Sequence, residues 1–167
     1  MKKTLLALAL LGCSATASAE SLIYGGVDVG SSDLGGDSST SYGVHVGTSL
    51  SMIPFLGLEA GYQDFGKFDS SNYDNTSGEL KANTKYIALR PSLELGPLQV
   101  YAKAGLHDYE IEATSGSYNQ SEVDGFYGIG AKYSIMGPLT VGASYNNFNF
   151  KNADMKSYNV SLSFHFL

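Results

Sequence analysis

The stretch YNVSLSFHFL, residues 158–167, decides the fold class of this chain. Bulky apolar side chains occupy every second position, and polar side chains occupy the positions between them. A period of two residues predicts a β-strand with one apolar and one polar face. The apolar face needs an apolar environment, and the rest of the sequence indicates which one.

The same alternation recurs along the whole chain and predicts eight strands, with no competing amphipathic helix. The predicted segments are Leu22–Gly30, Tyr42–Ser51, Leu56–Phe65, Ala82–Leu95, Leu98–Glu110, Val123–Ile135, Leu139–Phe148 and Lys156–Phe166. Short connectors that contain proline alternate with longer polar, largely acidic ones such as SSDLGGDSSTS (31–41) and GKFDSSNYDNTSGE (66–79). Short turns at one end and long loops at the other predict an antiparallel up-and-down meander.

The composition of the polar face distinguishes two kinds of barrel. In a soluble barrel with an apolar interior, the polar face would be exposed to water and would be rich in Lys, Glu and Thr. Here the polar face is mostly Gly, Ser and Tyr with a few charges. An eight-stranded barrel is only just wide enough for its side chains, so a glycine-rich polar face fits the inside. The sequence therefore predicts an all-β, eight-stranded transmembrane β-barrel whose apolar face contacts lipid.

Aromatic residues on the lipid face support this prediction, because transmembrane barrels carry an aromatic girdle at each membrane interface. The predicted upper girdle contains Tyr62, Tyr127, Tyr145 and Tyr158. The predicted lower rim contains Tyr133, Phe164 and Phe166.

The first residues have the pattern of a bacterial export signal. Lys2 and Lys3 precede a short apolar run, and Ala17-Ser18-Ala19 forms a small-residue cleavage site. We expect a signal peptide at 1–19 and an outer-membrane barrel domain at 20–167, in a Gram-negative bacterium. An alternative is a lipoprotein box that ends at Cys13, which would then be acylated.

The charge and cysteine content of residues 20–167 exclude several functions. Loss of Lys2 and Lys3 from the ten basic residues leaves eight against sixteen acidic residues, a net charge of −8. This charge argues against nucleic acid as a partner. The segment contains no cysteine and no spacing typical of metal ligands, so we expect neither a metal nor another cofactor.

Six polar residues at inward positions are predicted to form an interior network. They are Asp28, His45, Glu59, Arg90, Lys103 and Lys132. Charges away from water must pair, and we expect Glu59 to contact Arg90 or Lys132. A filled interior is the expected outcome, with a narrow passive pore for small solutes or ions as the alternative.

The three histidines raise the possibility of an enzyme. A hydrolase of this kind needs a serine, a histidine and an acid close together near the lipid-facing rim. His45 and His107 point inward, His165 lies at the lower rim, and HDYE (107–110) has no serine adjacent in sequence. We therefore predict no catalytic site.

The segments GLEAGYQDFG (57–66) and VYAKAGLH (100–107), together with the last strand, resemble the transmembrane domain of OmpA-type outer-membrane proteins. The resemblance implies that Glu59 and Arg90 belong to an interior ion-pair network, which has been proposed as a gate in that family. This chain departs from the pattern, because Gly142 replaces an arginine and Lys132 stands where an acid is expected.

The resemblance also implies how the barrel is inserted and used. Asn159, Phe164 and Phe166 are similar to the signal read by the barrel-assembly machinery, although Ser161 replaces the usual glycine and Leu167 follows the final aromatic residue. The chain ends at the eighth strand and looks like a stand-alone small barrel of the OmpX/Ail and opacity-protein groups.

We therefore expect a small monomeric barrel with a structural or surface-interaction role, in adhesion, colonisation or envelope integrity. Acidic extracellular loops would carry this role, through lipopolysaccharide or a host or cell-surface ligand.

Overall fold

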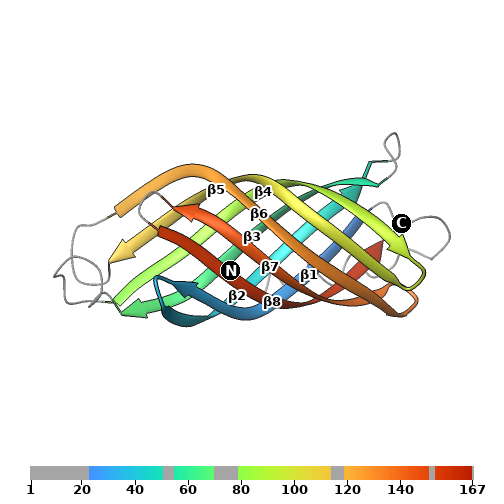
Figure 1. Ribbon diagram of the computed structural model, residues 1–167, viewed down its shortest axis with the longest axis horizontal. Coiled ribbons are helices and arrows are strands. Elements are labelled where there is room, and N and C mark those ends of the chain that lie inside the picture. Colours follow the sequence, from blue (N-terminus) through green and yellow to red (C-terminus); the bar gives the residue numbers. More distant parts are fainter. Residues whose placement is uncertain (1–22, 51–54, 70–78, 114–118, 151–152, 167) are drawn as a thin grey trace, which may run out of the picture.

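The computed structural model describes residues 23–50, 55–69, 79–113, 119–150 and 153–166. The predicted signal peptide lies outside these residues. The described chain forms eight strands: β1 (Ile23–Leu34), β2 (Asp37–Ser49), β3 (Leu56–Asp69), β4 (Glu79–Leu95), β5 (Leu98–Ala113), β6 (Asn119–Met136), β7 (Leu139–Phe150) and β8 (Ala153–Phe166). Each strand pairs antiparallel with the next, and the sheet closes into a barrel (Figure 1).

The barrel closes between its first and last strands. β1 and β8 pair without interruption from Ile23 opposite Phe166 to Leu34 opposite Met155. An open edge would leave backbone N–H and C=O groups without partners in an apolar environment, at a cost of several kcal/mol each. The predicted eight-stranded antiparallel up-and-down barrel is confirmed. Among the described residues, no helix is long and apolar enough to cross a membrane.

The two ends of the barrel differ in how the strands are connected. At one end, which we call the turn end, two-residue turns at Gly96–Pro97 and Gly137–Pro138 join neighbouring strands. At the opposite end, which we call the loop end, the connections include residues 70–78 and 114–118, which lie outside the described chain. The prediction that short turns containing proline lie at one end of the barrel is confirmed for these two turns.

The prediction of a long loop at 31–41 is wrong. Residues 31–34 and 37–41 continue β1 and β2, and a tight turn at Gly35 and Gly36 joins them. Both glycines have positive φ, 63° and 98°, as a two-residue hairpin turn requires. The stretch lacks apolar alternation, but hydrogen bonds between the strands need none. Acidic residues expected in loops, such as Asp33, Asp37 and Asp154, therefore lie on strand ends.

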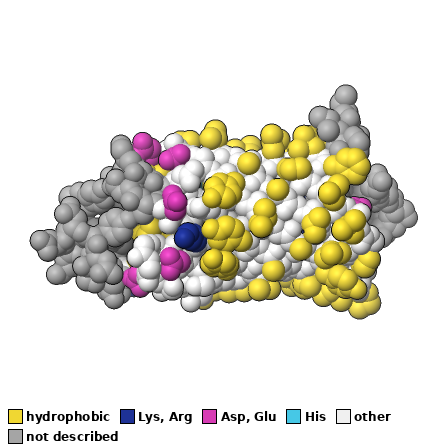
Figure 2. Space-filling model, viewed as in Figure 1, with side chains coloured by type: hydrophobic (Ala, Val, Ile, Leu, Met, Phe, Trp, Pro, Cys, Tyr) yellow, Lys and Arg dark blue, Asp and Glu magenta, His cyan; other side chains and the backbone are white. Residues whose placement is uncertain are grey.

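The outer wall of the barrel is an apolar belt. Val27 is 54% exposed and Ile129 is 62% exposed, and Figure 2 shows hydrophobic side chains over most of the wall with acidic ones gathered beside the loop end. The predicted girdle residues Tyr62, Tyr127, Tyr133 and Tyr158 are exposed on this wall, together with Tyr42, which was not predicted. Because the apolar face points outward, the soluble-barrel alternative is wrong.

Inward-facing glycines make room for the interior tyrosine rings. The ring of Tyr24 lies over Gly47, and the ring of Tyr86 lies over Gly61. A Cβ atom at Gly61 would lie 2.6 Å from the Tyr86 hydroxyl oxygen. The same arrangement places Tyr101 over Gly130. The many glycines of the polar face are thus required by space, since every inward side chain competes for the same narrow interior.

The loop end of the interior holds a cluster of aromatic and apolar side chains, which we call the aromatic plug. Its members are Leu34, Phe65, Phe68, Ala82, Tyr86, Ala88, Tyr109, Phe126, Phe148 and Met155. The rings of Phe126 and Phe148 stack with centroids 4.8 Å apart, and Phe65 meets Phe148 edge-on at 5.1 Å. The alternation predicted tyrosines such as Tyr86 and Tyr109 on the inside, but it did not indicate that Phe65, Phe126 and Phe148 would join them in a plug.

We predict that Gly61→Ala lowers the free energy of unfolding by about 1–3 kcal/mol, because the added methyl group must displace the buried Tyr86 ring. Urea titration of the refolded protein in detergent measures the effect. Gly125→Ala is the matched control, since a Cβ atom there meets nothing closer than 3.9 Å. Equal stability of the two variants would show that the inward glycines are not required by space.

Candidate functional site

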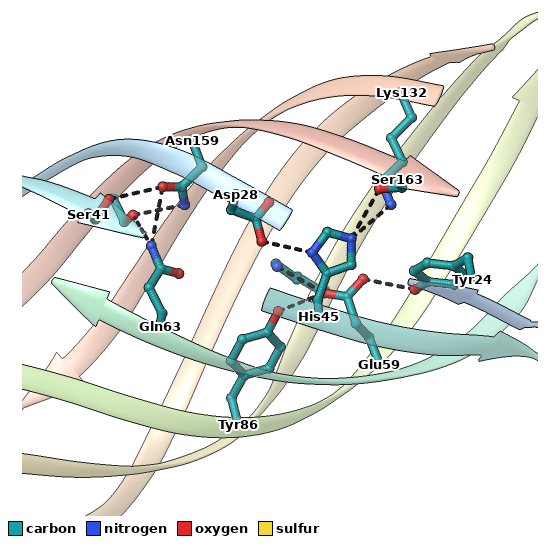
Figure 3. A network of polar contacts seen from close by, with 12 residues as sticks. Tyr24, Asp28, Ser41, His45, Glu59, Gln63, Tyr86, Lys132, Asn159 and Ser163 are labelled. Carbon is teal, nitrogen blue, oxygen red and sulfur yellow. Dashed lines mark hydrogen bonds and ion pairs between the residues drawn. The ribbon is translucent and has the colours of Figure 1, made fainter. Parts of the chain in front are cut away.

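The carboxylate of Glu59, on β3, is the centre of the interior polar network. Oε2 accepts a hydrogen bond from the Tyr24 hydroxyl at 2.8 Å. Oε1 accepts hydrogen bonds from the Tyr86 hydroxyl at 3.0 Å and from Lys103 Nζ at 3.1 Å. Glu59 is only 3% exposed, so these partners replace water around the charge (Figure 3).

Arg90 adds a second cation beside Glu59. Its Nε lies 3.5 Å from Glu59 Oε2, and its Nη2 donates to Gln99 Oε1 at 2.9 Å. The guanidinium group stacks 3.9 Å from the centroid of the Tyr101 ring. The structure thus brings Glu59 and Arg90 together as expected, with Lys103 as the other cation.

Lys132 occupies a different part of the interior from the one its sequence position suggested. Its Nζ lies 3.5 Å from His45 Nε2 and 4.5 Å from the centroid of the Tyr24 ring. No carboxylate oxygen of the described residues lies within 4.0 Å of it. β6 lies three strands away from β3 around the barrel, so Lys132 reaches the interior beside His45 and Tyr24 and does not contact the Glu59 carboxylate.

Asp28, His45 and Ser163 form a hydrogen-bonded chain. His45 Nδ1 lies 2.7 Å from Asp28 Oδ2, and His45 Nε2 lies 3.1 Å from Ser163 Oγ. The Lys132 ammonium beside Nε2 can only donate, so we assign Nε2 as the acceptor and Nδ1–H as the donor to Asp28. Sequence reasoning missed Ser163, because only barrel closure brings β8 to His45.

The series Asp28, His45 and Ser163 has the order of groups found in serine hydrolases, but its surroundings differ from those of an active site. Ser163 is 1% exposed, and Gly26 lies so close that a Cβ atom there would be 2.6 Å from Ser163 Oγ. A hydrolase needs space for an acyl group beside the nucleophile and donors for the oxyanion. The packing around Ser163 leaves no such space.

A layer of neutral polar side chains lies beside the charges, and Tyr86 alone among the plug residues described above donates directly to Glu59. Asn159 Oδ1 accepts hydrogen bonds from Ser41 Oγ at 3.1 Å and Gln63 Nε2 at 3.2 Å. Gln63 also donates to Ser157 Oγ at 2.8 Å. Asn159, expected as part of an assembly signal, is therefore buried in this layer. From the turn end to the loop end, the interior passes from charged groups through amides and hydroxyls to aromatic rings.

The two remaining histidines lie at opposite ends of the barrel interior. His107 belongs to the loop end, where Nδ1 meets Thr84 Oγ1 at 3.1 Å and Nε2 donates to the Asn149 carbonyl at 2.9 Å. His165 stacks against Tyr24 at the turn end with ring centroids 5.6 Å apart. The described residues contain no group of three or more His, Cys, Asp or Glu side chains that could hold a metal ion.

The last strand carries its aromatic residues on the outer wall at the turn end. The rings of Phe164 and Phe166 lie 4.9 Å apart, and both side chains are half-buried. Higher on the same strand, Tyr158 lies 5.0 Å from Tyr145 of β7. Tyr158, Phe164 and Phe166, the aromatic residues predicted on the lipid face of β8, therefore lie on the same outer face of the strand.

A closed eight-stranded barrel with an apolar wall and a polar interior is the architecture of outer-membrane barrels. Residues 4–166 match the outer membrane protein beta-barrel domain family. This chain belongs to that family. The resemblance to OmpA-type transmembrane domains and to small outer-membrane barrels is thereby confirmed, as is the location in the outer membrane of a Gram-negative bacterium.

Individual relatives support the same conclusion. The chain is 29% identical to outer membrane protein P5 of Haemophilus influenzae over 178 residues, which cover 87% of this chain and 50% of that protein. It therefore spans about half the length of that relative. Two other Haemophilus influenzae P5 sequences match with 28% identity.

Solved structures show the same fold at low identity. Neisserial surface protein A superposes with a TM-score of 0.64 and 15% identity, covering 90% of this chain and all of that one. The attachment invasion locus protein Ail of Yersinia pestis superposes with a TM-score of 0.59 and 11% identity, covering 87% and 97%. The outer-membrane enzyme PagL superposes with a TM-score of 0.50 and 14% identity, covering 84% and 98%. Outer-membrane barrels have short periplasmic turns, so the turn end of this family member faces the periplasm.

We predict that Glu59→Gln lowers the free energy of unfolding by about 3 kcal/mol, because it leaves the charges of Arg90 and Lys103 buried without a carboxylate. Glu94→Gln, at an exposed position on the same barrel, should change it by less than about 0.5 kcal/mol. Urea titration of both refolded variants measures the difference. An unaltered Glu59→Gln variant would mean that the Glu59 charge is not needed to hold the two cations.

Proposed function

We propose that this protein acts through its outer surface, as a monomeric structural and interaction barrel of the outer membrane. The observation that carries the proposal is the filled interior. Charged, neutral polar and aromatic layers follow one another along the barrel axis and leave the external wall and the loop end for contacts. The burial of Ser163 supports a non-enzymatic role, although the fold also occurs in an enzyme.

The loop end offers a strand edge to a partner. β6 pairs with β5 as far as Asn119, which lies opposite Glu112. Its pairing with β7 ends at Phe126, opposite Phe148. Residues 119–125 are therefore paired on one side only within the described chain, and Figure 1 shows the start of β6 extending beyond the end of β7. An edge of this kind can accept an added strand.

The direction of the backbone groups follows from one hydrogen bond near the turn end. Ser134 donates its N–H to the Pro97 carbonyl, on the β5 side. Since the groups of alternate residues point to opposite sides, those of Val123 point away from β5. Gly125 also points away, and Asp124 Oδ1 accepts its N–H at 2.7 Å. Among the described residues, Val123 thus presents the central backbone N–H and C=O groups of this edge that no neighbouring strand pairs.

The charge at the loop end indicates the chemistry of the partner. Acidic residues outnumber lysines on the outer parts of the strands. The acids are Asp33, Asp37, Asp64, Asp108, Glu110, Glu122, Asp124 and Asp154, against Lys67, Lys81, Lys85 and Lys156. The Ail structure contains the heparin analogue sucrose octasulfate, a polyanion. An acidic loop end favours the opposite class, an extended cationic polypeptide segment.

For export and assembly, we propose that residues 1–19 are a cleaved signal peptide and that the barrel-assembly machinery recognises the last strand. Phe164 and Phe166 support the second proposal, because their rings face outward together at the turn end. Asn159 is buried in the interior, so it would contribute to recognition by the assembly machinery only before the barrel closes.

We predict that Val123→Pro weakens binding of a synthetic peptide of alternating lysine and valine by about tenfold, because proline removes the free N–H without affecting pairing to β5. Binding to the barrel in lipid nanodiscs is measured by fluorescence anisotropy. Val123→Thr keeps the N–H and should bind like the wild type. A control peptide of the same length, with two of its valines replaced by proline, should not bind. Equal affinity of all three barrels for the alternating peptide would contradict docking at this edge.

We predict that the wild-type barrel shows no steady conductance in planar bilayers, because charged, polar and aromatic side chains of the described strands occupy its narrow interior. Heat-modifiable migration of the same preparation on gels confirms that it is folded. Conductance that changes in the Glu59→Gln variant would contradict this prediction and support the alternative of a narrow pore lined by the polar network.

A further inference from the structure

Lys132 is the one buried lysine or arginine of the described strands that no carboxylate contacts. Its side chain is 3% exposed, and its Nζ lies 3.5 Å from His45 Nε2, a neutral acceptor. The centroid of the Tyr24 ring lies 4.5 Å from Nζ, but the Arg90 guanidinium lies 5.0 Å from the same centroid. Because the two cations share this ring, it compensates only part of the charge of Lys132. A buried charge in such surroundings needs an anion.

The charges in this part of the interior do not balance. Three cations lie near two carboxylates, and the five groups are Asp28, Glu59, Arg90, Lys103 and Lys132. Glu94, at the turn end, is exposed, so water already surrounds its charge. With His45 neutral, as its contacts to Asp28 and Lys132 indicate, the interior carries one positive charge in excess.

The Ser161 hydroxyl, beside Lys132, has no hydrogen-bond partner among the described residues. Ser161 is 4% exposed, so water at the surface does not supply one. A Cβ atom at Gly142 would lie 2.8 Å from Lys132 Cγ and 2.8 Å from Ser161 Oγ, so the two side chains are neighbours across this glycine. A buried hydroxyl is expected to be hydrogen-bonded. A water molecule would satisfy the hydroxyl but would not balance the charge.

The turn end gives the shortest route to this position. Ser134, the next residue on the inner face of β6, is exposed at that end. Toward the loop end, the residues of the aromatic plug occupy the interior. We therefore expect a small ion to enter from the periplasm.

We propose that a chloride ion binds beside Lys132 as a structural part of the barrel interior, held by the Lys132 ammonium and the Ser161 hydroxyl. Its single negative charge balances the excess, and it accepts hydrogen bonds from both groups. A phosphate or sulfate ion needs more space than this narrow interior offers. Asp28 does not take this place. It lies opposite Ser161 on β1, where its carboxylate accepts a hydrogen bond from His45 at 2.7 Å.

The chloride dependence of unfolding tests this site, because a ligand that binds only the folded state stabilises it as its concentration rises. The urea midpoint of protein refolded in an uncharged detergent is measured at neutral pH, while sodium chloride replaces sodium gluconate at constant ionic strength. Lys132→Met removes the charge, and Lys85→Met, at an exposed position of β4, is the matched control. Ser161→Ala removes the unpartnered hydroxyl. Its control is Ser157→Ala, which removes a hydroxyl of the same strand that already accepts from Gln63.

The midpoints of the wild type, Lys85→Met and Ser157→Ala should rise with chloride, and that of Lys132→Met should rise no further than the change of salt alone produces. Ser161→Ala should need about tenfold more chloride for the same rise, because a hydrogen bond to a charged group is lost.

Bromide gives a second measurement, which does not depend on the refolding of any variant. Crystals of the wild-type barrel grown in sodium bromide should show an anomalous peak beside Lys132 and Ser161. Absence of this peak would overturn the proposal. So would equal chloride dependence of the wild type and Lys132→Met, and the amine of Lys132 would then be neutral in the folded barrel.

Discussion

The need to pair every backbone N–H and C=O group inside a membrane is the constraint on which this structure depends. Eight strands meet it by closing β8 onto β1 over their full length. Closure with only eight strands makes the interior narrow, and the narrow interior determines the composition of the inner face. Tyr24 and Tyr86 fit inside because Gly47 and Gly61 lie beneath them. The glycine content is therefore a consequence of strand number.

The narrow interior also determines how charges are accommodated. Glu59 is stable there because two tyrosine hydroxyls and two cations surround its carboxylate. Lys132 has no such partner among the described residues, and the rings of Tyr24 and Tyr101 and the acceptor nitrogen of His45 surround it instead. With Gly142 in place of an arginine and Lys132 in place of an acid, this interior lacks two members of the ion-pair network that the resemblance to OmpA-type proteins implies.

A filled interior confines interactions to the outside of the barrel, where the wall and the loop end differ in chemistry. The wall is apolar, which suits the lipid bilayer. The loop end is acidic with a one-sided strand edge, which suits a cationic polypeptide. These two surfaces meet at the girdle near Tyr127, Asn147 and Lys156. A single small barrel can therefore contact its membrane and a partner at the same time.

The sequence by itself determined the strand number, the direction of each face and the class of membrane protein, because alternation with a period of two is a local property that barrel closure does not alter. It also identified Glu59 and Arg90 as inward charges. Only the tertiary structure decided which groups meet. Ser163 reaches His45 across 118 residues, Lys103 takes the place expected for Lys132, and Phe65, Phe126 and Phe148 come together as a plug. These contacts depend on strand tilt and register around a closed barrel, which no single segment of the sequence encodes.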